Sequence, residues 1–129
     1  NCTITMANTD WAYAINMPAS VTNLNLDVNE CALTGAIALQ CWGDSNEINI
    51  DNSELICNYT TNALYTSYCL AFQNNGTSVA ESNTLKVTKS KFNYIGVDNF
   101  ESEIKSIHNG DPSNEISVSD CIYEGGVIE

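Results

Sequence analysis

An eight-residue pattern of apolar and polar positions recurs along this chain. In its central copy, Ile48–Leu55, apolar residues stand at the first, third and eighth positions, a small residue at the sixth, and mostly polar residues elsewhere. Further copies begin at Leu26, Leu85 and Ile116, and a weaker one begins at Ile4. Such a pattern would arise by chance roughly once in a chain of this length, so five copies indicate a repeated β-structure.

The spacing of the copies predicts a solenoid. Their first residues, at positions 4, 26, 48, 85 and 116, are separated by 22, 22, 37 and 31 residues. A repeat near 22 residues that contains a period-2 strand favours one repeat per turn, with neighbouring turns burying each other's faces. A second short strand is expected in each turn, at Ala12–Met17, Ala36–Cys41, Tyr68–Phe72 and Glu103–Ile107. The polar insertions are expected to be loops on one flank: Asn58–Asn62, Gln73–Ser82, Gly96–Ser102 and Asn109–Ser113.

This arrangement resembles the right-handed parallel β-helix of the pectate-lyase-like superfamily. Asn46, Asn83 and Asn114 each stand two positions before the first apolar residue of a copy. In that superfamily Asn often occupies such a turn and forms a ladder with its neighbours. Leu24 and Cys2 stand at the equivalent positions of the first two copies, so the expected ladder is incomplete. The resemblance implies an all-β, right-handed parallel β-helix of about five turns. A β-sandwich of short alternating strands is the alternative.

Stacked parallel strands lie about 4.8 Å apart, so equivalent positions should form continuous columns. The expected apolar columns are Val28, Ile50, Val87 and Val118, and Leu33, Leu55, Phe92 and Tyr123 led by Trp11. A column of small residues at a bend should contain Thr9, Cys31, Ser53, Ser90 and Cys121. On the surface, Lys91 should lie beside Glu54, Lys89 between Asn52 and Asp120, and Lys86 next to Asn49. These lysines either balance charge across turns or form a small basic strip for an acidic sugar.

Length and charge narrow the possible functions. At 129 residues the chain is expected to form a single domain, 1–129. It contains 18 Asn but only four Lys and no Arg, and its formal net charge is −12. Such a chain repels phosphate backbones and anionic lipid, so we expect no nucleic-acid partner. The acidity either confers solubility or provides a cation-binding surface.

Cysteines and sequons favour an extracellular protein. Six Cys in a short chain indicate an oxidising compartment, and Cys41 and Cys69, on successive second strands, are the expected disulfide. Cys31 and Cys121 lie three turns apart, about 14 Å, which is too far for a disulfide. The sequons predict glycosylation at Asn1, Asn58 and Asn75. The chain has no run of 18 apolar residues, so we expect no membrane insertion. It does not open with a basic segment followed by an apolar one, so we expect that any signal peptide has already been removed.

Catalytic and metal-binding chemistry is weakly represented, and we expect neither an enzyme nor a cofactor. His108 is the single histidine and no Cys-x-x-Cys spacing occurs, which disfavours zinc and iron–sulfur sites. β-Helix enzymes that cleave polyuronides generally use Arg or Lys against the substrate charge, and this chain lacks Arg. Carboxylate pairs such as Glu101 with Glu103 exist, but five short turns build almost no cleft in which to hold them for glycosidase chemistry.

Three functions remain open, one of which is a small disulfide-stabilised toxin or inhibitor. The pattern begins at Ile4 and ends near Tyr123, so the stack is expected to have uncapped ends that other copies cover, giving a secreted structural or adhesive fibre. The chain could also be a fragment of a longer protein. The alternative function is a carbohydrate-binding β-helix module of a larger protein, in which aromatic residues stack on sugar rings. The simpler explanation of the same aromatic residues is that they cover the base of a loop or a subunit contact. The candidate aromatic residues are Trp42, Tyr59, Tyr65 and Tyr68.

Overall fold

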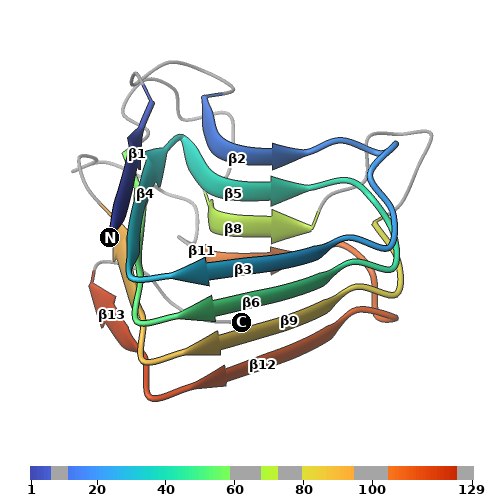
Figure 1. The fold of residues 1–129 in the computed structure, drawn as a ribbon. Coiled ribbons are helices and arrows are strands. Elements are labelled where there is room, and N and C mark those ends of the chain that lie inside the picture. Colours follow the sequence, from blue (N-terminus) through green and yellow to red (C-terminus); the bar gives the residue numbers. More distant parts are fainter. Residues whose placement is uncertain (7–11, 59–67, 73–79, 95–104, 125–129) are drawn as a thin grey trace.

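The chain forms a parallel β-helix built from three sheets. The computed structural model describes residues 1–6, 12–58, 68–72, 80–94 and 105–124, which contain thirteen β-strands and no helix. All strand pairs are parallel, and successive strands of each sheet stand three apart in chain order. One turn therefore contains one strand from each sheet, and Figure 1 shows these turns wound one below another.

The three sheets are named here A, B and C. Sheet A contains β1 (Cys2–Thr5), β4 (Cys31–Gly35), β7 (Glu54–Cys57), β10 (Lys91–Tyr94) and β13 (Ile122–Glu124). Sheet B contains β2 (Tyr13–Met17), β5 (Ile37–Cys41), β8 (Tyr68–Phe72) and β11 (Lys105–Asn109). Sheet C contains β3 (Asn25–Asn29), β6 (Glu47–Asp51), β9 (Thr84–Thr88) and β12 (Glu115–Ser119). The described strands thus make four full turns and one strand of a fifth.

Four of the five predicted repeats stack in the predicted register. In sheet C, Ile48 lies opposite Leu26 and Leu85, and Leu85 lies opposite Ile116. The two apolar columns are confirmed, since Val28, Ile50, Val87 and Val118 align in sheet C, and Leu33, Leu55, Phe92 and Tyr123 align in sheet A. The predicted second strands coincide with β2, β5, β8 and β11 within two residues at each end. The all-β parallel solenoid is therefore confirmed.

The predicted register of the weak first copy, which begins at Ile4, is wrong. Ile4 lies in β1, where its partner is Leu33, so it occupies the eighth position of the pattern and not the first. Cys2 likewise aligns with Cys31 and leads the column of small residues, the place that the pattern assigned to Thr9. Thr9 and Trp11 lie outside the described residues. Ile4 belongs to an end strand whose environment differs from that of the middle turns, which explains the wrong alignment.

Each copy of the eight-residue pattern contains parts of two strands and not one. The pattern crosses the corner between sheets C and A, so its first half forms a strand of sheet C and its second half a strand of sheet A. The residue at the corner takes a positive φ in every described turn, between 47° and 55°. These corner residues are Glu30, Asn52, Lys89 and Asp120. One left-handed residue turns the chain while the hydrogen-bond ladders on both sides remain in register.

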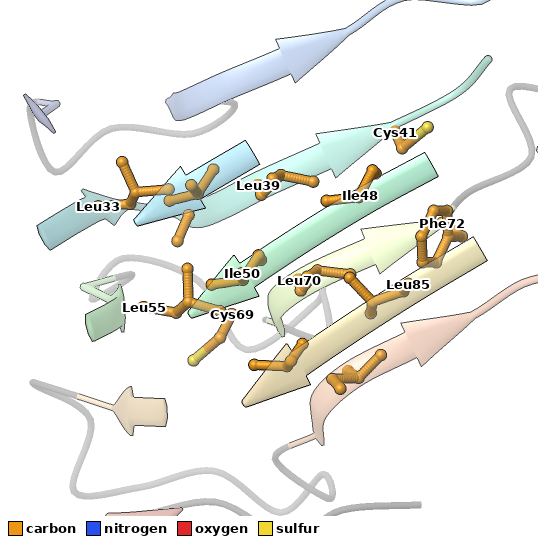
Figure 2. Packing of buried hydrophobic residues seen from close by; sticks show 14 of the residues in the cluster. Leu33, Leu39, Cys41, Ile48, Ile50, Leu55, Cys69, Leu70, Phe72 and Leu85 are labelled. Carbon is orange, nitrogen blue, oxygen red and sulfur yellow. The ribbon is translucent and has the colours of Figure 1, made fainter. Parts of the chain in front are cut away.

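The core consists of the inward-facing columns. Ile48, Leu55 and Leu85 have no exposed surface, and Figure 2 shows these side chains between the facing sheets. Sheet C alternates strictly, with polar residues on its outer face and apolar residues inward. All residues of β5 and the last four of β8 are buried, so the middle of sheet B is covered on both faces.

An asparagine ladder closes the corner before sheet C. The side-chain oxygen of Asn83 accepts the N–H of Asn46 at 2.9 Å and its side-chain amide at 3.1 Å. Asn114 accepts the N–H of Asn83 at 2.9 Å, and Asn46 accepts the N–H of Leu24 at 2.9 Å. All three Asn are buried. The ladder expected from the resemblance is therefore present, and it ends at Leu24 because that residue has no amide to continue it.

A second ladder, which the sequence did not reveal, closes the corner before sheet A. Ser90 Oγ accepts the N–H of Ser53 at 3.1 Å, and Ser53 Oγ accepts the N–H of Cys31 at 3.1 Å. Each serine hydroxyl in turn donates to the carbonyl two residues earlier, at 2.8 Å. The small column is thus set by hydrogen bonding as well as by space, because a hydroxyl can both accept and donate at this bend.

Replacing Asn83 with Ala should destabilise the protein by about 1–3 kcal/mol, because the buried N–H and amide of Asn46 lose their shared acceptor. Urea unfolding followed by circular dichroism measures this loss. Asn49→Ala is the matched control, since Asn49 bonds Asp27 on the outer face of sheet C, and it should change stability by no more than about 0.5 kcal/mol. Equal losses in the two variants would show that the ladder adds nothing specific.

Candidate functional site

A shallow groove of about 700 Å³ runs along the outer side of the corner between sheets C and A. It crosses all the described turns, from Cys2 and Cys31 at one end to Asp120 and Ile122 at the other. Its polar groups come from the corner residues and from the first residues of the sheet A strands. The groove is open along its length, so it offers a surface for an extended partner and not an enclosed chamber.

Charges of both signs line this groove. Lys91 Nζ lies 3.4 Å from Glu54 Oε1 and 2.8 Å from Glu124 Oε2. Hydrogen bonding to Glu124, helped by Glu54, raises the pKa of Lys91. Lys89 has no carboxylate within 4.0 Å among the described residues, although Asn52 and Asp120 precede and follow it in the corner column.

The predicted lysine neighbours are all confirmed. Lys91 is the register partner of Glu54, and Lys86 is the partner of Asn49. Two carboxylates pair with Lys91, so charge balance between turns accounts for this residue. Of the described residues that line the groove, Lys89 is then the one lysine without a carboxylate partner, which is too little for a basic strip. Such exposed ion pairs contribute little to stability. Within the described residues, no group of three or more His, Cys, Asp or Glu side chains could hold a metal ion.

The two aromatic candidates that the structure describes belong to separate ring pairs, since Trp42 directly follows β5 and Tyr68 begins β8. Trp42 is half-buried and packs edge-on against Tyr13, with ring centroids 6.5 Å apart. Its buried indole N–H has no hydrogen-bond partner among the described residues. Tyr68 is half-buried and stacks on His108 with centroids 4.5 Å apart. Tyr59 and Tyr65 lie outside the described residues. Tyr13 and His108 were not expected beside these rings, because strand register alone does not predict ring contacts.

The expected Cys41–Cys69 disulfide does not fit the register. Cys41 lies opposite Phe72, so Cys69 is three positions away along the neighbouring strand, about 11 Å at ordinary strand geometry. That distance exceeds the reach of a disulfide. Figure 2 shows the side chains of Cys41 and Cys69 well apart within the buried cluster. Cys69 instead lies against the backbone of Cys57, on the neighbouring strand of sheet A.

The sequon asparagines differ in their surroundings. Asn1 is exposed, whereas Asn58 is half-buried, and its backbone N–H donates to Gly35 at 2.9 Å. The buried side-chain oxygen of Asn58 accepts no hydrogen bond from the part of the chain that the structure describes. Asn75 lies outside the described residues. Glycosylation at these sites remains a prediction.

Both ends of the described stack expose residues of the core columns. Ile48, Ile50 and their partners in β9 are at most 1% exposed, whereas Leu26 in β3 and both Ile116 and Val118 in β12 are only half-buried. In sheet A, Ile4 and Tyr123 are half-buried at opposite ends of a column whose other members are at most 1% exposed. The described stack therefore has incompletely covered apolar surface at each end.

Within the described ranges, the edge strands of sheet A also present unpaired backbone groups. The N–H of Cys2 donates to the carbonyl of Glu30, just before β4, and the N–H of Met6 donates to that of Thr34 within β4. The N–H groups of Thr3 and Thr5 therefore point to the free edge. At the other end, the N–H of Ile122 donates to Ser90, so that of Tyr123 points to the free edge. A free row of donors and acceptors on a parallel edge is a template for another strand.

No family model, curated protein or solved structure matches this chain. The part of the chain that the structure describes contains no helix that could cross a membrane.

In the protein with reduced thiols, stability should fall as the pH rises above about 9. Burial raises the pKa of the Cys69 thiol from its ordinary value of 9.0 to about 12. Between pH 9 and 12 the unfolded state loses a proton that the folded state keeps, so the free energy of unfolding falls by about 1.4 kcal/mol per pH unit. Denaturant unfolding at several pH values measures the slope. Cys69→Ala should have a smaller slope, and an unchanged slope would contradict the assignment to this thiol.

Proposed function

We propose that this chain is an extracellular structural or adhesive β-solenoid whose copies associate end to end into a fibre. The observation that carries the proposal is the rise in exposure of the core columns from the middle of the described stack to its two ends. A second copy offers the same columns at the same spacing. The proposal includes no catalytic activity and no cofactor.

The outermost strands of sheet A can meet without a clash between the other two sheets. It has one strand more than sheets B and C, so the two ends are stepped, and β13 and β1 are its outermost strands. If β1 of a second copy continues the register of sheet A below β13, its Ile4 lies against Tyr123 of the first copy. That contact covers two half-buried members of one apolar column and leaves room for a further strand in each of sheets B and C.

The free backbone groups agree with this direction of stacking. In β1, the groups of Thr3 and Thr5 point to the free edge, and in β13 those of Tyr123 do. In a continued ladder, the N–H of Thr5 in one copy would donate to the carbonyl of Tyr123 in the other. Because the two edges belong to opposite ends of the molecule, the contact is head-to-tail, and repeating it produces an open filament.

Thr5→Pro should weaken end-to-end association by about tenfold, because proline removes the edge N–H and is tolerated on an edge strand. Sedimentation velocity across a range of concentrations measures the association, and electron microscopy detects fibres. Thr5→Ala keeps the N–H and is the matched control, so it should assemble like the unaltered protein.

Unaltered protein that stays monomeric at every accessible concentration would refute the fibre. Association that is equally strong in Thr5→Pro would instead move the contact away from the free edge of β1. Circular dichroism on both variants separates a lost contact from a lost fold.

The extracellular location is supported by composition and not by a contact. Six cysteines and three sequons in one short acidic chain are typical of secreted proteins, and we include glycosylation at one or more of Asn1, Asn58 and Asn75 in the proposal. The buried Asn ladder further supports a place in the pectate-lyase-like superfamily, where a corner of this kind is common.

A carbohydrate-binding module is the second candidate. The half-buried Tyr68, already stacked on His108, presents the kind of aromatic surface on which a sugar ring packs. Trp42 beside Tyr13 provides a second such surface on the same sheet.

If this alternative holds, Tyr68→Ala should weaken glycan binding by about tenfold, because the stacking ring is lost. A glycan array followed by calorimetry on any hit measures the affinity. Tyr68→Phe keeps the ring and should bind like the unaltered protein. An array without a specific ligand, or equal binding by Tyr68→Ala, would remove this candidate.

A further inference from the structure

Two cysteines lie next to each other at the start of the small column. Cys2 in β1 and Cys31 in β4 are direct register partners. Neighbouring parallel strands lie about 4.8 Å apart, which falls within the range of about 4.4–6.8 Å between the Cα atoms of disulfide-linked residues. As register partners in a parallel pair, both side chains leave their strands on the same face.

The surroundings of this pair allow a covalent bond to form. Cys2 is exposed, Cys31 is half-buried, and both line the corner groove, so a reagent in solution can reach them. The Cβ atoms of a disulfide lie about 3.8 Å apart, closer than the strand spacing, so one strand must shift slightly. As an edge strand, β1 pairs only with β4, and three of its four residues are exposed. It is therefore the strand best able to make that shift.

The other cysteines do not compete for this pair within one molecule. Cys121 belongs to the same column, but Ser53 and Ser90 separate it from Cys31 by three strand spacings, about 14 Å. Cys41, Cys57 and Cys69 are buried in the core. Of the small column, only its first two positions place two thiols on adjacent strands.

We infer that Cys2 and Cys31 form a disulfide that fastens β1 to the rest of the β-helix. The oxidant is a disulfide of the thiol–disulfide exchange class. The Cys2 thiolate attacks it and releases one thiol, and the Cys31 thiolate then attacks the sulfur of Cys2 and releases the second. Two electrons pass to the oxidant, both cysteine protons end on the released thiols, and one new S–S bond closes the chain between positions 2 and 31.

The bond holds the strand that the proposed fibre contact uses. Its oxidant is expected in the extracellular compartment, and in that respect the inference rests on the proposed function. The exchange itself needs neither that compartment nor assembly, so it can be tested on the purified full chain with oxidised glutathione.

Peptide mapping without reduction is the decisive measurement. Protein incubated with a glutathione redox buffer should yield a peptide that links Cys2 to Cys31, and the intact mass should be about 2 Da lower. Cys31→Ser should abolish the link yet fold, because serine is the natural residue at this position in the two following turns. Cys121→Ser is the matched control and should retain the link.

A second readout follows the strand itself. The amides of β1 that bond β4 should exchange with deuterium about tenfold more slowly in the oxidised protein than in the reduced protein, because edge strands open locally. Cys31→Ser should show no difference between the two conditions. Cys2→Ser provides the reciprocal check.

Two results would overturn the inference. In the first, Cys2 and Cys31 both remain alkylatable in the folded protein after oxidation. In the second, Cys2 links to Cys121 of another copy, which would refute the internal bond while supporting the end-to-end contact. A monomeric protein that nevertheless has the internal link would refute the fibre alone, so the two failures are distinguishable.

Discussion

Register between stacked strands is the constraint on which the whole molecule depends. Every column, core and surface alike, exists because each strand of a sheet repeats its neighbour without slipping. A slip by one residue would turn Ile48 and Ile50 outward and place Asn49 in the core. The backbone ladder alone does not prevent such a slip, since its bonds are the same at every register. The two side-chain ladders at the corners do, because Asn46 can meet Asn83, and Ser53 can meet Ser90, in one alignment only.

Much of the fold could be predicted because its repeats share one environment. Positions such as Ile50 and Leu55 recur as apolar residues since each faces the same interior, and their spacing alone indicates a stack. The same logic correctly predicts that Lys91 lies beside Glu54. The weak first repeat failed for the converse reason, since Ile4 belongs to an end strand whose environment differs from that of the middle turns.

Other features depend on contacts that a single sequence does not reveal. Glu30 and Lys89 adopt positive φ although neither residue type favours it, because the ladders on both sides hold the corner. The hydroxyl of Ser53 bridges two turns, whereas the pattern indicated only that its position is small. Cysteine partners are similarly hidden, because Cys41 and Cys69 occupy corresponding strands but different positions along them. The groove follows from the corner geometry and so could not be anticipated at all.

Both corner ladders have a direction. In each, the backbone N–H of one turn is accepted by a side chain of the turn that follows it in the chain, as with Leu24 and Asn46, or Cys31 and Ser53. A ribosome releases the turns in that same order. Each corner N–H therefore exchanges water for its buried acceptor only when the following turn is in place. The corners of the β-helix can thus close in one order only, the order in which the turns follow one another along the chain.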